Sequence, residues 1–189
     1  ILGASSSRNP LASIGASREM KLVLAYELPF ILSIIVVIIK SGATIQLGQI
    51  LAHQLQSGSN LVSWSGALAF IVAILCMQAK LGFVPFDASE AEQEIMGGVL
   101  IEYSGLPLAI FKLTKAVLLY TMPLFLIILF WAGNLSPLAL IGKYLALLVI
   151  VVLIKKTNPR QRNDQSLRIL WRFPTLLALV AVVLALLGL

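Results

Sequence analysis

The fold of this chain is decided by its apolar runs, the longest of which reads Leu106-Pro-Leu-Ala-Ile-Phe-Lys-Leu-Thr-Lys-Ala-Val-Leu-Leu-Tyr-Thr-Met-Pro-Leu-Phe-Leu-Ile-Ile-Leu-Phe-Trp131. A helix needs roughly 20 apolar residues to cross the hydrocarbon core of a bilayer, and this run is long enough although it contains Lys112 and Lys115. The sequence therefore predicts an all-α fold, a polytopic transmembrane helix bundle of about five spans that forms a single membrane domain over residues 1–189. The other four runs occupy residues 22–39, 61–79, 138–154 and 173–189.

Composition also indicates a membrane protein. Hydrophobic residues make up 59% of the chain and charged residues only 12%, whereas a soluble domain carries roughly 25% charged residues. The formal net charge of +6 would fit a nucleic-acid partner. However, the basic residues gather beside the apolar runs, and residues 155–172 hold six Lys or Arg against the single acid Asp164. The preference of Lys and Arg for cytoplasmic connections explains that cluster without nucleic acid.

The same preference predicts the orientation of the bundle. Arg8, Arg18 and Lys21 precede the first run. Six basic residues precede the last run, so both segments are expected on the cytoplasmic side. Each span crosses the membrane once, so connection 80–105, which follows the second span, also faces the cytoplasm. The uncharged connection 132–137, one span further along, lies outside.

Few residues could form a catalytic or metal centre. The single cysteine, Cys76, lies in an apolar run and the single histidine, His53, in a connection. No disulfide and no metal site made of Cys or His alone can therefore form within the chain. No nucleophile–base pattern and no phosphate-binding glycine loop is visible, so we expect no catalytic residue and no metal or cofactor bound by this chain. The start at Ile1, without a signal-peptide pattern, leads us to expect a piece of a longer subunit.

Carboxylates are concentrated in one connection. Five of the eight acids lie within residues 87–102, where they repel one another and are costly to keep charged at membrane depth. Such a group suits proton handling or the docking of a basic partner; the alternative is a solvated helix with well-capped ends. Capping-box spacing predicts a short helix over residues 89–96. The five acids are Asp87, Glu90, Glu92, Glu94 and Glu102.

Charged residues also lie inside the predicted spans, and Glu27, Lys112 and Lys115 are the candidates for function among them. Glu27 is one helical turn inside the first span, and a carboxylate at that depth indicates a functional site. Alternatively, Glu27 is an interface residue that the long side chains of Arg18 and Lys21 reach. Lys112 and Lys115 lie near the entrance of the third span, where they either neutralise the acidic connection or extend to the cytoplasmic interface.

These residues carry a family resemblance. Pro85-Phe86-Asp87-Ala-Ser-Glu90-Ala-Glu92-Gln-Glu94, followed by Ile101-Glu102-Tyr103-Ser104-Gly105, resembles the signature loop of one family. It is the respiratory complex I membrane subunit that abuts the quinone-reducing arm, a family shared with energy-converting membrane-bound NiFe hydrogenases. Two further stretches agree in order and spacing: Gly15 to Arg18 followed by Tyr26-Glu27, and the basic connection from Asn158 to Trp171. The resemblance covers nearly all of the chain and corresponds to the family's spans four to eight.

The resemblance implies an interface between a redox module and proton-conducting membrane subunits, in the cytoplasmic membrane of a prokaryote. Its partners would be soluble NiFe-type large and small subunits that hold the NiFe centre and iron–sulfur clusters, with antiporter-like and small membrane subunits beside it. The acids of the loop would form a water-filled proton path into the membrane. Carried over by position, that path comprises Glu27, Asp87, Glu90, Glu92, Glu94, Glu102, Lys112 and Lys115, with Arg18, Tyr26 and Tyr103 in support.

Departures from the complex I pattern bear on the electron acceptor. Complex I versions carry an acid and an arginine where this chain has Lys80 and Phe83, and a glutamate where it has Lys115. Those positions lie near the quinone path, so the resemblance favours the hydrogenase side, and a sulfur-reducing relative is equally compatible. A buried Lys115 needs a carboxylate partner to stay charged, which Glu94 or Glu102 could supply.

Three other classes fit parts of the sequence. A quinone-chamber subunit of the complex I kind fits the acidic loop. A secondary transporter would use Glu27 as its coupling carboxylate, but it predicts an inverted repeat, which is not visible. A passive anchor would use the acidic loop only to dock a basic partner, and it gives Glu27 no role.

Overall fold

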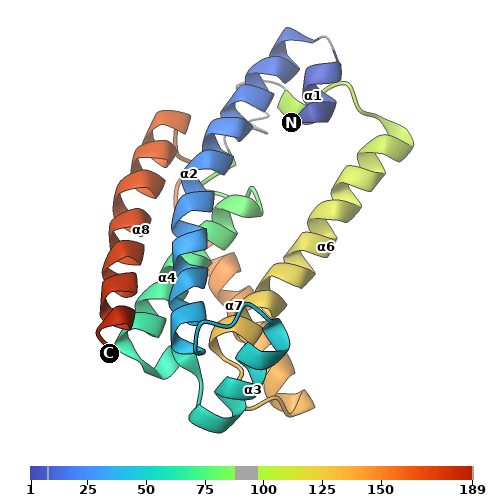
Figure 1. Cartoon of the computed structure of the whole chain (residues 1–189). Coiled ribbons are helices and arrows are strands. Elements are labelled where there is room, and N and C mark those ends of the chain that lie inside the picture. Colours follow the sequence, from blue (N-terminus) through green and yellow to red (C-terminus); the bar gives the residue numbers. More distant parts are fainter. Residues whose placement is uncertain (8, 88–97, 189) are drawn as a thin grey trace.

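The computed structural model describes residues 1–7, 9–87 and 98–188, and over those ranges the chain is helical and contains no β-strand. The five longest of these helices form a bundle (Figure 1), which confirms the predicted all-α class. The elements in chain order are α1 (Leu2–Ser6), α2 (Pro10–Lys40), α3 (Leu47–Ser57), η1 (Asn60–Val62), α4 (Trp64–Lys80), η3 (Gly98–Leu100), α6 (Gly105–Phe130), α7 (Pro137–Thr157) and α8 (Asn163–Leu186).

The first predicted span is a helix, but α2 begins at Pro10 rather than at residue 22. Asn9 caps it, because the Asn9 Oδ1 accepts a hydrogen bond from the Leu11 amide at 2.9 Å, and Pro10 suits the first helical position. At 1.5 Å per residue, the 31 residues of α2 extend over about 46 Å, beyond the ~30 Å hydrocarbon core. The polar first turns of α2 therefore project from the membrane, and hydropathy alone does not register them.

Helices also lie at the four other predicted spans. α2, α6, α7 and α8 are long and apolar enough to cross a membrane. α4 is equally apolar in character but shorter, with 17 residues. It begins after Ser63, whose Oγ accepts a hydrogen bond from the Gly66 amide at 3.2 Å.

The core lies where α2, α4 and α8 pack against one another. Fully buried small residues face these contacts, Ala69 and Ala73 on α4 and Ala178 and Ala181 on α8, and small residues allow membrane helices to approach closely. α6 packs against α7. In Figure 1, α6 leans away from α2 towards the end of the bundle that carries the N-terminus.

The connection between the first two predicted spans contains the helix α3. α3 has 11 residues, and its buried Gln54 anchors the end of α6. The Gln54 Nε2 donates to the carbonyl oxygens of Ile128 and Leu129, both at 2.9 Å, and its Oε1 accepts from the Ala132 amide at 3.1 Å. The last carbonyl groups of a helix have no hydrogen-bond donor within the helix. Gln54 donates to two such carbonyl groups of α6.

Three connections meet at one end of the bundle. They are the segment before α2, the segment between α4 and α6 as far as it is described, and the segment between α7 and α8. The connection from α2 to α4 and the turn between α6 and α7 lie at the opposite end. The predicted grouping of the connections is therefore present, while the assignment of the first end to the cytoplasm stays a prediction.

Candidate functional site

The acidic connection is tied at its start to the basic connection before α8. The Asp87 Oδ1 lies 3.1 Å from the Arg160 Nε, and the Arg160 Nη2 donates to the Asp87 carbonyl oxygen at 3.3 Å. The next amide, that of Gln161, donates to the Pro85 carbonyl oxygen at 3.3 Å. The pair is only partly solvated, since the Arg160 side chain is 31% exposed and that of Asp87 is 23% exposed. The positive charge of the Arg160 guanidinium therefore compensates the negative charge of Asp87, the first acid of the acidic connection.

The last acid of the cluster, Glu102, lies against the start of α2. The Glu102 Oε1 accepts a hydrogen bond from the Asn9 Nδ2 at 2.5 Å, and the same Asn9 caps α2 through its Oδ1. The N-terminus of a helix carries partial positive charge, which favours a carboxylate nearby. Glu102 is thus held beside the N-terminus of α2.

Tyr103 and η3 fix this end of the connection on α1 and α2. The Tyr103 hydroxyl donates to the Gly3 carbonyl oxygen at 2.8 Å, and its ring packs edge-on against Phe111 with centroids 5.0 Å apart. Gly15 lets the backbone of α2 approach η3, because a Cβ at position 15 would lie 2.9 Å from the Val99 nitrogen. Both described ends of the acidic connection are therefore anchored.

Three of the predicted path residues, Glu90, Glu92 and Glu94, lie outside the described residues, as does the predicted helix over residues 89–96.

Tyr26 and Glu27 lie on different sides of α2. Tyr26 is buried, at 5% exposed, in a cluster that includes Cys76 of α4 and Leu170 of α8. Glu27 is exposed on a helix long and apolar enough to cross the membrane. A carboxylate facing outwards at that depth is costly unless water or another chain covers it.

A cavity of about 210 Å³ lies between α2, α4 and α6 at the acidic end, and each helix contributes one ionisable side chain to it. These are Glu19 of α2, Lys80 of α4 and Lys115 of α6. The Lys80 Nζ also lies over the ring of Phe30, 5.5 Å from its centroid. Lys112 is exposed and is not among the lining residues. The two lysines that the sequence groups together therefore have different surroundings.

Among the described residues, Glu19 is the acid that lines this cavity together with Lys115, and the predicted pairing of Lys115 with a loop carboxylate stays a prediction. Glu102 contacts Asn9, and the alternative partner Glu94 is outside the described residues. Glu19 escapes sequence-based selection because it precedes the apolar run and stands next to the basic Arg18. With α2 extended back to Pro10, Glu19 falls on one helical stripe with Tyr26 and Phe30, and that register is the signal that could have found it.

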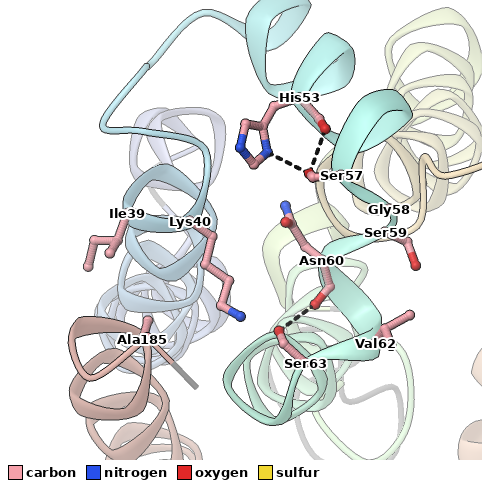
Figure 2. A pocket seen from close by; sticks show the side chains of 11 residues that line it. Ile39, Lys40, His53, Ser57, Gly58, Ser59, Asn60, Val62, Ser63 and Ala185 are labelled. Atoms are coloured by element: carbon pink, nitrogen blue, oxygen red, sulfur yellow. Dashed lines mark hydrogen bonds between the residues drawn. The ribbon is translucent and has the colours of Figure 1, made fainter.

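A second cavity, of about 500 Å³, lies at the opposite end of α2 (Figure 2). Lys40 extends into it from the end of α2, and His53 and Ser57 line it from α3, with the His53 Nδ1 and the Ser57 Oγ 3.1 Å apart. Glu19 and Lys40 are 21 residues apart in the same helix, which corresponds to about 31 Å. Cavities that contain ionisable side chains therefore lie at both ends of a membrane-length stretch of α2.

These features define a class of protein: a polytopic membrane subunit whose acidic connection is held at one end of the helix bundle. Comparison with known proteins then identifies the family, because the model of the NADH dehydrogenase family matches residues 1–186. The chain belongs to this family.

Individual relatives agree with that assignment. The chain is 31% identical over 194 residues to the H subunit of the NADH-quinone oxidoreductase of Geobacillus thermodenitrificans, covering 97% of this chain and 57% of that protein. It is 32% identical over 192 residues to the same subunit of Anoxybacillus flavithermus, covering 96% and 56%. The chain therefore spans less than two thirds of the length of these relatives.

A solved structure is similar over nearly the whole chain. It belongs to the membrane-bound sulfane sulfur reductase (MBS), an archaeal respiratory membrane complex, and matches with a TM-score of 0.89 and 32% identity. The match covers 96% of this chain and 62% of the other. The family resemblance carried by the acidic loop is thus confirmed.

Proposed function

We propose that this chain is the non-catalytic membrane subunit of a redox-driven ion-pumping complex and couples a soluble NiFe hydrogenase-type module to proton translocation. In this proposal the electrons reduce protons or a sulfur compound at the soluble module, and no quinone enters the cavity of this chain. The NiFe centre and the iron–sulfur clusters belong to partner subunits. Antiporter-like and small membrane subunits complete the complex.

The observation that carries the proposal is the charge of the cavity between α2, α4 and α6. Among the described residues, the ammonium groups of Lys80 and Lys115 and the carboxylate of Glu19 line a space of about 210 Å³. Burying each of these charged groups against an apolar ring would cost several kcal/mol, so the cavity favours water over a quinone ring. Water beside groups that can gain and lose protons is a suitable setting for proton transfer.

Phe83, the other departure from the complex I pattern, supports the same proposal. Its ring lies under Lys155 of α7, whose Nζ is 4.6 Å from the ring centroid. Phe83 therefore packs on a neighbouring helix and offers no polar group to a quinone carbonyl.

The proposed proton path runs from the acidic connection into the membrane. Asp87 and Glu102 stand at its anchored ends, and Glu90, Glu92 and Glu94 lie between them in the sequence. Glu19 and Lys115 continue the path in the cavity. Glu27 lies eight residues further along α2, about 12 Å deeper. We place the acidic and basic connections on the cytoplasmic side, where the soluble module would bind.

The second candidate is a quinone-chamber subunit of the complex I kind. It is favoured by the 31% identity to a membrane subunit whose name includes quinone. The likeness to a chain of a sulfane sulfur reductase favours the remaining alternative, the equivalent subunit of a sulfur-reducing relative, because that name specifies a sulfur compound.

The test uses the assembled complex in proteoliposomes, with reduced methyl viologen as electron donor and decylubiquinone as trial acceptor. We expect hydrogen release, or sulfide release when a polysulfide is added as acceptor, with proton movement into the liposomes and no electron transfer to decylubiquinone. Lys115→Gln should lower the protons moved per electron. Lys112, which the family resemblance also places on the path, is exposed and does not line the cavity, so we leave it out of the proposed path and expect Lys112→Gln to keep the wild-type ratio. Rapid reduction of decylubiquinone by the complex would overturn the proposal in favour of the quinone chamber.

A further inference from the structure

A groove of about 480 Å³ runs between α2 and α8 on the surface of the bundle, where the two helices lie side by side (Figure 1). Its floor is apolar and its rim is basic. We call it the α2–α8 groove; its lining residues are Lys21, Leu24, Leu167, Arg168, Trp171 and Arg172.

A polar cavity of about 430 Å³ adjoins the groove, and Lys21 belongs to both. Arg18 and Arg162 add basic groups to this cavity, and Asp164 is the acid among its described lining residues. Among those described residues, basic groups therefore outnumber carboxylates at the head of the groove. The whole region favours an anionic ligand.

The other end of the groove opens onto lipid-facing helix surface. Leu24, Leu28 and Ile31 follow Lys21 at spacings of three and four residues and are 64%, 49% and 55% exposed, so they form one apolar stripe on α2. Trp171, 61% exposed, stands beside the basic rim. Indole rings prefer this boundary between headgroups and hydrocarbon.

We propose that the α2–α8 groove binds an anionic phospholipid, with its phosphate at the basic rim and one acyl chain along the apolar stripe of α2. The phosphate forms charge-assisted hydrogen bonds with the guanidinium and ammonium groups. A free phosphate would leave the apolar floor uncovered, and an acidic soluble protein would have to reach membrane depth to cover the stripe. An anionic lipid can contact the basic rim through its phosphate and the apolar stripe through an acyl chain at the same time.

The test measures quenching of Trp171 by brominated lipids in vesicles that contain the full chain. The signal of Trp171 is the difference between the wild-type chain and Trp171→Phe, because Trp64 and Trp131 are present in both. The vesicles are phosphatidylcholine with a small fraction of either dibrominated phosphatidylglycerol or dibrominated phosphatidylcholine. We expect the phosphatidylglycerol to quench Trp171 more strongly.

The matched variants each remove two positive charges. Lys21→Gln with Arg172→Gln removes charge from the groove, whereas Lys155→Gln with Lys156→Gln removes it from α7, which lines neither cavity. Because each basic group near an anionic lipid surface favours binding by roughly fivefold, the groove variant should lose the preference and the α7 variant should keep it. Soluble glycerol phosphate at the lipid concentration should leave the quenching unchanged.

Equal quenching by the two lipids in the wild-type chain would overturn the proposal. So would an equal loss of preference in the two double variants, which would indicate general attraction to an anionic surface. Relief of quenching by glycerol phosphate would also overturn it, because the acyl chain would then contribute nothing.

Discussion

Gly15→Ala tests whether α2 holds the end of the acidic connection. A Cβ at position 15 would lie 2.9 Å from the Val99 nitrogen, 3.1 Å from the Gly98 carbonyl carbon and 3.2 Å from the Gly98 Cα. All three are backbone atoms, which cannot rotate away as a side chain could. α2 and η3 must therefore separate, and overpacking of this kind costs about 1–3 kcal/mol.

Gly142→Ala is the matched control, because Gly142 is the sixth residue of α7 as Gly15 is of α2. A Cβ at position 142 would meet nothing within 4 Å. Alanine improves helix propensity at both positions, by up to about 1 kcal/mol, so the difference between the variants isolates the clash. We expect Gly15→Ala to be less stable than Gly142→Ala by about 1–3 kcal/mol, measured by denaturant unfolding of the purified chain in detergent. Equal stabilities would refute the close approach of α2 and η3.

Three further predictions concern the anchors and the orientation. Gln54→Ala removes the partners of the Ile128 carbonyl and the Ala132 amide, each worth about 1–3 kcal/mol, while the Leu129 carbonyl keeps its hydrogen bond from the Asn60 Nδ2. Gln54→Ala should therefore lower thermal stability far more than Gln56→Ala on the exposed face of α3; similar losses would contradict the anchor. A double-mutant cycle of Asp87→Asn and Arg160→Gln should give a favourable coupling of about 1 kcal/mol or less, and an unfavourable coupling would show that the pair does not form. A cysteine at Lys156 should react with an impermeant maleimide only from the cytoplasmic side, and one at Asn134 only from outside. The buried Cys76 gives little background, and the reverse pattern would invert the proposed orientation.

The long helices could be predicted because the bilayer imposes a simple requirement. A spanning helix must be apolar over roughly 20 residues, and each of the five runs coincides with a helix. The first turns of α2 and most of α3 could not be found in this way. They lie beyond the apolar runs and depend on the Asn9 cap and on the contacts of Gln54, which are tertiary or local polar interactions without a hydropathy signal.

The candidate site was predictable in its residue types but not in its pairings. The density of acids and the family resemblance select Asp87 and Glu102. Their partners are remote in sequence, since Arg160 is 73 residues from Asp87 and Asn9 is 93 residues from Glu102. The spacing of neighbouring residues along the sequence does not indicate such contacts. The cavity that joins Glu19 to Lys115 likewise requires three helices to be placed together.

The proposed proton path is tested most directly by the number of protons translocated per electron in proteoliposomes that contain the assembled complex with Glu27→Gln. Glutamine keeps the size of the side chain and much of its hydrogen bonding but cannot carry the proton. Asp164→Asn, which alters an exposed acid outside the path, is the control. We predict that both variants assemble with every subunit present and that the ratio of protons to electrons falls in Glu27→Gln alone. A wild-type ratio in the assembled Glu27→Gln complex would contradict the proposed path.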